Sequence, residues 1–248
     1  MTTSYALRAL TLRKTKLGEA DIILTLLSDD GRIVRAVAKG MRKPTSRFAG
    51  RLEPASVADL MLAPGRTLEI VSDARSVDLH AGLRTDYDRS TAASVVLDVL
   101  DKMAVEGQAE ERLFGLACAT LSALEHASIE HLRVTVTAFL LKAMAMHGYR
   151  PHLDSCVSCA CAAESGAGFS LEAGGVLCPA CGGSAPPLSG GSRDMLSWLL
   201  ASTMDAIADA DLPAREVGET FSLMRQFVTY HLPARLKALE FYANGGGS

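Results

Sequence analysis

Residues 20–38 read ADIILTLLSDDGRIVRAVA, and this stretch contains the strongest structural signal in the chain. Two apolar runs, Ala20–Leu27 and Arg32–Ala38, flank the turn Ser28-Asp29-Asp30-Gly31. A glycine that follows aspartate between two such runs supplies the positive φ that a tight hairpin turn requires. We therefore predict a β-hairpin here, within an antiparallel sheet.

Similar apolar runs lie on both sides of this hairpin. Tyr5–Leu12 precedes it, and a Pro-Gly turn joins Val57–Leu62 to Thr67–Val71, with Arg75–Leu79 as an extension. About five short strands in this region favour a small closed barrel, because closure removes exposed sheet edges. An oligonucleotide-binding (OB) barrel fits the pattern, and an SH3-like barrel would give a similar one.

The remainder of the chain changes character, because its apolar residues recur at helical spacing. Pro233 should kink or divide the last helix, since proline lacks the N–H that a helix interior uses. A stretch rich in Cys, Gly, Ser and Pro interrupts the helices and cannot build a core of its own. We expect a multidomain α+β protein with an OB-type barrel at 1–80, a helical body at 81–150 and 192–243, an inserted cysteine module at 151–191, and a flexible tail at 244–248.

The composition is that of a folded protein, with 48% hydrophobic and 21% charged residues and a net charge of −3. Disorder caused by high charge and low hydrophobicity is excluded. The apolar stretch Ala138–Met146 contains Lys142 and is far shorter than the roughly 20 residues that span a bilayer. No secretory signal precedes the first strand, so we expect a soluble, cytoplasmic protein without membrane contact.

Four of the six cysteines form the pattern C-x2-C-x18-C-x2-C. Each C-x2-C turn lets two thiolates converge on one ion, and this spacing is typical of a tetrahedral zinc site. Four sulfur ligands leave no position for water, which favours a structural Zn²⁺ over a catalytic one. The expected metal ligands are Cys156, Cys159, Cys178 and Cys181.

Three other residues complicate this assignment. Cys161 or His152 could replace one of the four ligands, because each lies close to the first pair. A thiol-disulfide centre is the competing interpretation, although a redox C-x-x-C normally opens a helix and this one lies in a Gly/Ser loop. Cys118 lies in an apolar helical pattern, and we expect it to be a buried small hydrophobic residue.

The barrel contains a stretch of cations without acidic residues. Residues 1–80 contain 13 Lys and Arg against 9 Asp and Glu, a net charge of +4, which leaves −7 for the rest of the chain. Such a local excess suits DNA phosphates, although a solvated loop is the alternative. Since Tyr5 and Phe48 are the only aromatic residues in 1–80, we expect phosphate contacts instead of base stacking. The candidate DNA-binding residues are Arg32, Arg35, Lys39, Arg42, Lys43, Arg47 and Arg51.

Motifs of common enzymes are absent from the sequence. Neither G-x-x-x-x-G-K-[ST] nor H-E-x-x-H nor G-x-S-x-G occurs, and the six histidines are scattered. We therefore expect a protein that is not an enzyme.

Several short motifs occur in a specific order along the chain. They are Leu17-Gly18-Glu19-Ala20-Asp21, Lys39-Gly40-Met41-Arg42, Leu52-Glu53-Pro54, Gly148-Tyr149-Arg150-Pro151, the two C-x2-C pairs, and the C-terminal Tyr230–Phe241. In this order the chain resembles the RecO family of bacterial recombination mediators over essentially its full length. The resemblance implies an OB barrel, a helical domain and a structural zinc module.

The resemblance also implies a function in the repair of chromosomal DNA. Members of the family bind single- and double-stranded DNA, anneal complementary strands and, with RecR, help load RecA onto DNA coated with the single-stranded DNA-binding protein (SSB). An acidic SSB tail with an apolar end would need an apolar groove beside a cation, for which the candidates are Arg133, Lys142, Arg235 and Lys237. The alternative function is a zinc-stabilised protein-binding adaptor without direct DNA contact.

Overall fold

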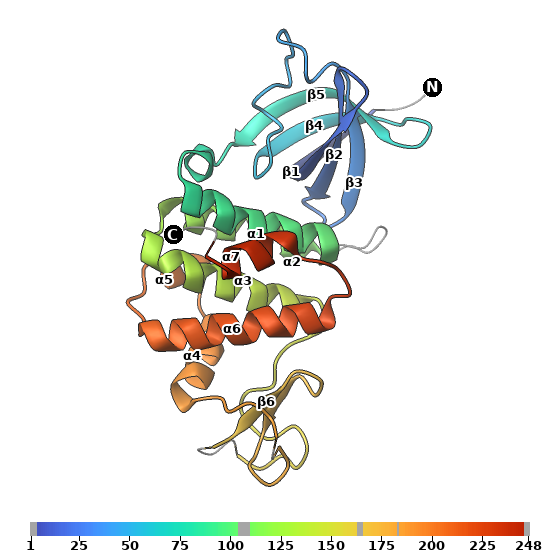
Figure 1. Ribbon diagram of the computed structural model, residues 1–248. Coiled ribbons are helices and arrows are strands. Elements are labelled where there is room, and N and C mark those ends of the chain that lie inside the picture. The colour runs from blue at the N-terminus through green and yellow to red at the C-terminus, as the bar shows by residue number, and fades with distance from the viewer. Residues whose placement is uncertain (1–3, 104–109, 163–165, 183, 246–248) are drawn as a thin grey trace. The chain divides into compact units, whose positions relative to one another are not determined.

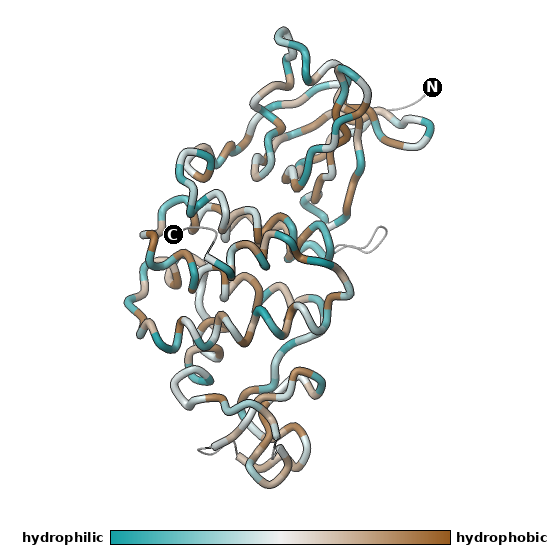
Figure 2. Tube along the Cα trace, in the orientation of Figure 1, coloured by the Kyte–Doolittle hydropathy of each residue, from teal (hydrophilic) through white to brown (hydrophobic). Residues whose placement is uncertain are grey.

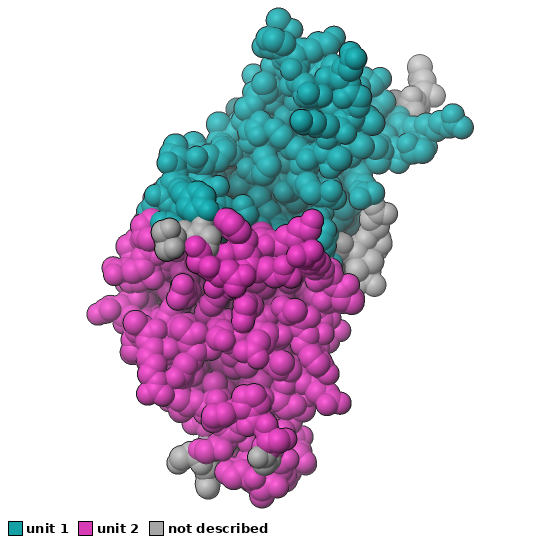
Figure 3. Space-filling view, viewed as in Figure 1, with its two compact units in different colours: residues 1–125 teal, residues 126–248 magenta. Residues whose placement is uncertain are grey.

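The chain folds into two compact units, residues 1–125 and 126–248, coloured separately in Figure 3. The predicted flexible tail, residues 244–248, lies at the end of the second unit. Its last residues, 246–248, lie outside the described part of the chain. The computed structural model describes residues 4–103, 110–162, 166–182 and 184–245.

Five strands form a closed barrel in the N-terminal unit, in the order β1-β2-β3-β5-β4 with β4 paired back to β1 (Figure 1). Neighbouring strands are antiparallel except β3 and β5, which run parallel. This order is that of an OB barrel, so it settles a choice that the apolar pattern left open. The strands are β1 Tyr5–Leu17, β2 Asp21–Ser28, β3 Ile33–Ala38, β4 Val57–Ala63 and β5 Glu69–Asp78.

The predicted hairpin between β2 and β3 is confirmed, with Leu27 opposite Ile33. Gly31 donates a 2.8 Å backbone hydrogen bond to Ser28 and has a φ of +83°. A Cβ atom on Gly31 would also meet the backbone of Glu110, so glycine is required for two reasons. The turn thus depends on both the local backbone conformation and a close tertiary approach.

The segment between β3 and β4 closes one end of the barrel with three apolar side chains. Met41 and Phe48 are each 5% exposed and Leu52 is fully buried, and all three belong to the barrel core. Their burial fixes the segment against the strands. We refer to residues 39–52 as the plug loop.

Two helices, α1 Tyr87–Met103 and α2 Glu111–His126, follow the barrel after the 3₁₀ turn η1 Ala81–Arg84. Helix α1 packs against β1, where Arg13 lies 3.3 Å from Asp101. The first compact unit therefore extends beyond the barrel strands.

The helical part of the C-terminal unit is organised around α3, whose side chains are buried along most of its length. Helix α3 contacts α4, α5 and α6, and apolar and polar residues alternate along the helices in Figure 2. The predicted interruption at Pro233 is confirmed, because α6 ends before it and α7 begins after it. The elements are η2 Ile129–His131, α3 Leu132–Met146, α4 Gly190–Ala201, α5 Met204–Ala208, α6 Ala214–His231 and α7 Lys237–Ala243. Within the described ranges, no helix is both long enough and apolar enough to cross a bilayer.

The cysteine module contains a short antiparallel pair of strands, β6 Gly168–Ser170 and β7 Gly175–Leu177. Phe169 on β6 packs edge-on against Phe227 of α6, with ring centroids 5.8 Å apart. This contact attaches the module to the helices of the C-terminal unit. The cysteine module has few other large apolar side chains that could form a core, as its composition indicates.

Candidate nucleic-acid interface and metal centre

All seven predicted DNA-binding side chains are exposed, but only some of them gather at one place. Lys39, Lys43 and Arg47 line a surface hollow of about 440 Å³ on the plug loop, together with the backbone and side chains of its turn. In the described part of the chain, Lys39 and Lys43 have no acidic partner. Their charges are therefore available to an anionic ligand.

Tertiary contacts of the plug loop hold this group in place. The guanidinium of Arg47 lies 5.0 Å from the ring centroid of Phe48 and donates to the carbonyl of Ser72 on β5. The backbone N–H of Gly40 donates a 2.7 Å bond to Oδ1 of Asp21. Because the apolar anchors alternate with cations, burying the anchors turns the cations outward.

The other predicted cations have different surroundings. Arg42 donates to the carbonyl of Gly18 at 3.2 Å, and Arg51 donates to that of Ala74 at 3.0 Å. Arg32 forms a 2.6 Å ion pair with Asp30, and this pairing lowers the pKa of Asp30 to about 2. Arg32 is thus neutralised locally, whereas Arg42 and Arg51 keep their charge because carbonyls are neutral partners.

The barrel offers little for base stacking. Phe48 is buried in the barrel core, and Tyr5 at the start of β1 is 37% exposed. Stacking on a series of exposed aromatic rings is the usual way in which sequence-tolerant proteins hold bases. The plug loop instead presents cations, which suits the phosphate backbone.

The four predicted ligand sulfurs come together in the C-terminal unit. The sulfurs of Cys156, Cys159, Cys178 and Cys181 all lie within 4.8 Å of one another. Zinc with bonds of about 2.3 Å would set tetrahedron edges of about 3.8 Å, and the Cys159 and Cys178 sulfurs are 3.8 Å apart. The residues present therefore fit a tetrahedral zinc ion.

Two similar backbone turns present these sulfurs. Ala160 N–H donates to the carbonyl of Cys156 at 2.8 Å, and Gly182 N–H donates to that of Cys178 at 2.9 Å. The backbone N–H groups of Cys178 and Cys159 lower the pKa of Cys156 to about 6. Such donors stabilise thiolates, which are the form that binds metal.

The residues that could have replaced a ligand lie outside this group. His152 is exposed, and its Nε2 lies 2.7 Å from the hydroxyl of Ser155. Cys161 is exposed and its sulfur lies 3.3 Å from that of Cys159. Cys118 is half-buried on α2 rather than fully buried as expected, and burial raises its pKa to about 11. That thiol therefore stays protonated and unreactive at neutral pH.

The four predicted partner-binding cations have different contacts. Arg133 lies 5.6 Å from the ring centroid of Phe221, and Arg235 lies 3.4 Å from Glu240. Lys142 is half-buried and donates to backbone carbonyls of the C-terminal unit. Lys237 is exposed at the start of α7.

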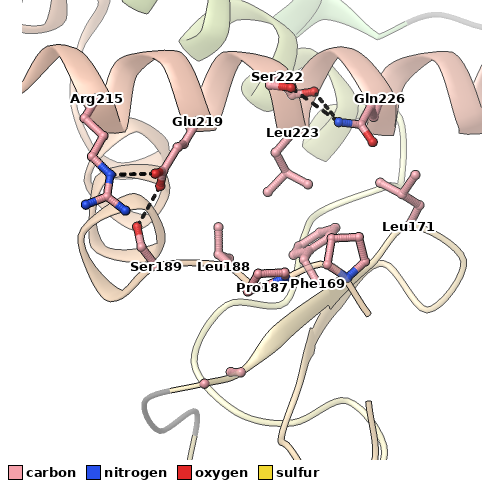
Figure 4. Close-up of a pocket in the computed structure, with 13 residues that line it drawn as sticks. Phe169, Leu171, Pro187, Leu188, Ser189, Arg215, Glu219, Ser222, Leu223 and Gln226 are labelled. Atoms are coloured by element: carbon pink, nitrogen blue, oxygen red, sulfur yellow. Dashed lines mark hydrogen bonds and ion pairs between the residues drawn. The ribbon is translucent and has the colours of Figure 1, made fainter. Parts of the chain in front are cut away.

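An apolar hollow with a cation on its rim does occur in the C-terminal unit, at a different place. It measures about 440 Å³ and lies between the cysteine module and α6 (Figure 4). Arg215 stands at its edge, and its Nε donates a 2.8 Å bond to Glu219. We call it the α6 hollow. Its apolar lining is Phe169, Leu171, Pro186, Pro187, Leu188 and Leu223.

Sequence patterns gave no indication of the α6 hollow, because its walls come from segments far apart in the chain. The same is true of a group at the end of the barrel, where Nδ1 of His80 lies 3.1 Å from Glu125 and 3.6 Å from Asp78. Glu125 also accepts a 2.7 Å bond from the Gly82 backbone, which ties α2 to η1. No local motif marks either arrangement.

Comparison with known proteins identifies the family from both ends of the chain. The model for "Recombination protein O N terminal" matches residues 1–80, and that for "Recombination protein O C terminal" matches residues 84–240. The chain belongs to the RecO family. A DNA repair protein RecO from Nocardioides sp. strain JS614 is 37% identical over 246 residues, covering 96% of this chain and 98% of the relative.

RecO membership gives this chain a role in recombination repair of DNA. It also confirms the expectation that the protein is not an enzyme, since that conclusion now rests on the family. The resemblance found in the short ordered motifs is confirmed over both halves of the RecO chain.

Proposed function

We propose that the protein binds single- and double-stranded DNA through the plug loop, anneals complementary strands and, with RecR, helps load RecA onto SSB-coated DNA in the cytoplasm. The observation that supports DNA contact is the convergence of Lys39, Lys43 and Arg47 on one hollow. Cations held in this way reduce the repulsion between two phosphate backbones. With little aromatic surface to sequester bases, Watson–Crick edges stay free to pair.

The experiment that tests this proposal compares two triple variants with equal loss of charge. In K39A/K43A/R47A the removed cations line the hollow, whereas in R8A/K14A/R32A each removed cation has an acidic partner. Single-strand affinity is measured across a salt series, and annealing of complementary SSB-coated oligonucleotides is measured without ATP. We expect the first variant to reduce the salt slope by about 2, since each lost contact removes about 0.7.

The control triple should keep most of the wild-type affinity and annealing rate, provided that circular dichroism shows a folded barrel for both variants. Equal losses in the two variants would mean that net charge, and not the hollow, governs binding. Absence of any salt-sensitive DNA binding in the wild type would favour the zinc-stabilised adaptor instead.

We further propose that a structural Zn²⁺ is held by Cys156, Cys159, Cys178 and Cys181. The match between the sulfur separations and a tetrahedral shell supports it. Zinc would supply the crosslink that a module with little apolar surface lacks. Elemental analysis should find one zinc per chain, and a chelator should make residues 151–191 sensitive to protease before the barrel. A metal-free protein that resists protease equally would contradict this assignment.

The α6 hollow is the site that we propose for the SSB tail. Its apolar walls suit the apolar end of that tail, and Arg215 on its rim, although ion-paired with Glu219 through Nε, has two terminal nitrogens as further donors for a carboxylate. Arg215→Glu should weaken binding of an acidic SSB tail peptide in fluorescence anisotropy. Arg112→Glu, at an exposed arginine of the other compact unit whose Nε lies 2.7 Å from Glu110, provides the matched control. Equal weakening in both variants would indicate general charge attraction.

A further inference from the structure

The fifth thiol of the cysteine module lies beside the ligand thiols of Cys159 and Cys178 without belonging to their group of four. The sulfur of Cys161 lies 3.3 Å from that of Cys159. This separation is shorter than the tetrahedron edge of about 3.8 Å that zinc–sulfur bonds of about 2.3 Å would set. Cys161 therefore sits against a ligand and does not occupy a further corner of the same shell.

The backbone holds Cys161 in this position. Ala160, the residue between the two cysteines, has a φ of +60°, which turns the chain back on itself. The carbonyl of Cys161 accepts a 2.8 Å bond from the Cys156 N–H. The two neighbouring thiols are thus brought together by the same turn that presents the first pair of ligands.

Exposure distinguishes this pair from the two buried ligands, whereas the remaining ligand, Cys181, is exposed as well. Cys159 and Cys161 are both exposed, whereas Cys156 and Cys178 are 2% and 7% exposed. A small oxidant in solution can reach the exposed pair directly, while the two buried sulfurs are shielded by the module. Oxidation of cysteine follows such access together with thiolate character.

We propose that Cys159 and Cys161 form an intramolecular disulfide when the protein meets hydrogen peroxide, and that Cys159 then ceases to be a metal ligand. This inference rests on the proposed zinc centre. Loss of one sulfur leaves three, so the module would hold its metal less tightly and lose its crosslink.

The chemistry balances with peroxide as the only co-reactant. The Cys159 thiolate attacks a peroxide oxygen, so that an S–O bond forms, the O–O bond breaks, and the departing hydroxide leaves as water after taking a proton. The Cys161 sulfur then attacks the Cys159 sulfur, forming the S–S bond. The S–O bond breaks, and the second hydroxide leaves as water with the thiol proton of Cys161. Two cysteines lose two electrons, and peroxide gains them.

The test begins with the full-length protein and its measured zinc content. Stoichiometric peroxide is added, zinc release is followed with the dye 4-(2-pyridylazo)resorcinol, and the disulfide is located by mass spectrometry of proteolytic peptides. We expect release together with a Cys159–Cys161 disulfide, both reversed by a phosphine reductant with added zinc. A wild-type disulfide that joins any other pair of cysteines would overturn the proposal.

Variants then assign the role of the fifth thiol. Cys161→Ser and Cys161→Ala should keep zinc yet release it about tenfold more slowly with peroxide, since the neighbouring thiol no longer acts at high effective concentration. Cys118→Ser, which removes a cysteine of the other compact unit, is the matched control and should behave as wild type. Unchanged release in both Cys161 variants would refute the proposal. A protein isolated without zinc would instead refute the metal centre itself, so the two failures differ.

Discussion

The ammonium group of Lys142 on α3 donates a 2.7 Å hydrogen bond to the carbonyl of Ser202, the residue that caps the C-terminus of α4. It donates a second bond, of 3.0 Å, to the carbonyl of Leu200. The last carbonyls of a helix lack intrahelical donors and carry partial negative charge. Lys142 therefore joins two helices of the C-terminal unit, although its sequence position made it a candidate for partner binding.

Replacing Lys142 should destabilise the protein. Lys142→Met leaves both carbonyls without their donor, and we expect the free energy of unfolding to fall by about 1–3 kcal/mol. Lys237→Met makes the same substitution at an exposed lysine of α7 and should change that value by no more than about 0.5 kcal/mol. Urea denaturation of both variants measures the difference. Similar values for the two variants would contradict the structural role of Lys142.

Glu219 should make stability depend on pH. Hydrogen bonds from Ser192, Arg215 and Ser189 lower its pKa from 4.5 to about 2. Because the folded state holds the charged form more strongly, the stabilisation is complete above 4.5 and is lost as pH falls from 4.5 toward 2. Glu219→Gln should therefore lower stability at pH 7 and flatten the acid limb, as measured by urea denaturation between pH 3 and 7.

A second variant separates this effect from general acid sensitivity. Ser192→Ala removes one donor to Glu219 and should flatten the acid limb in part. If the Glu219→Gln protein follows the wild-type pH curve throughout, the hydrogen-bonded carboxylate does not contribute as we expect.

Replacing Ala160 with glycine should stabilise the cysteine module. Its φ of +60° lies in the left-handed region, which costs a residue with a Cβ about 1–2 kcal/mol. Glycine removes this cost, but it also makes the unfolded chain more flexible, which offsets part of the stabilisation. Ala160→Gly should therefore stabilise the module by about 0.5–1 kcal/mol. Chelator competition and thermal unfolding measure it. Ala162→Gly, at a residue without positive φ, should not stabilise the module. Equal stabilisation by the two substitutions would contradict the interpretation that the backbone of Ala160 is strained.

Shortening the buried side chain that anchors the plug loop should weaken DNA binding, although the charge of the loop does not change. Leu52 is fully buried in the barrel core. Leu52→Ala should cost about 2–5 kcal/mol of stability, whereas Leu52→Met should cost less than about 1.5 kcal/mol. We expect DNA affinity to fall in the first variant while the barrel is still folded by circular dichroism. Unchanged affinity would mean that the cations act independently of the anchor.

Local features were predictable because they depend on neighbours in the chain. The hairpin turn at Gly31, the end of α6 before Pro233 and the spacing of the two C-x2-C pairs each follow from a few consecutive residues. The OB topology was harder to predict, because the apolar pattern of the sequence does not show that β3 pairs with β5 in parallel. That pairing joins Ala36 to Glu69, which no periodicity indicates.

The sequence by itself thus determined the strand-forming and helical regions, the cysteine spacing and the local excess of cations, since each is a property of composition or of short-range order. Only the tertiary structure decided which cations share a hollow. Arg47 reaches the plug loop's hollow from a position fixed by the carbonyl of Ser72, while Lys142 is directed inward by the end of α4. The direction of a long side chain depends on partners distant in sequence, and those partners come together only when the chain folds.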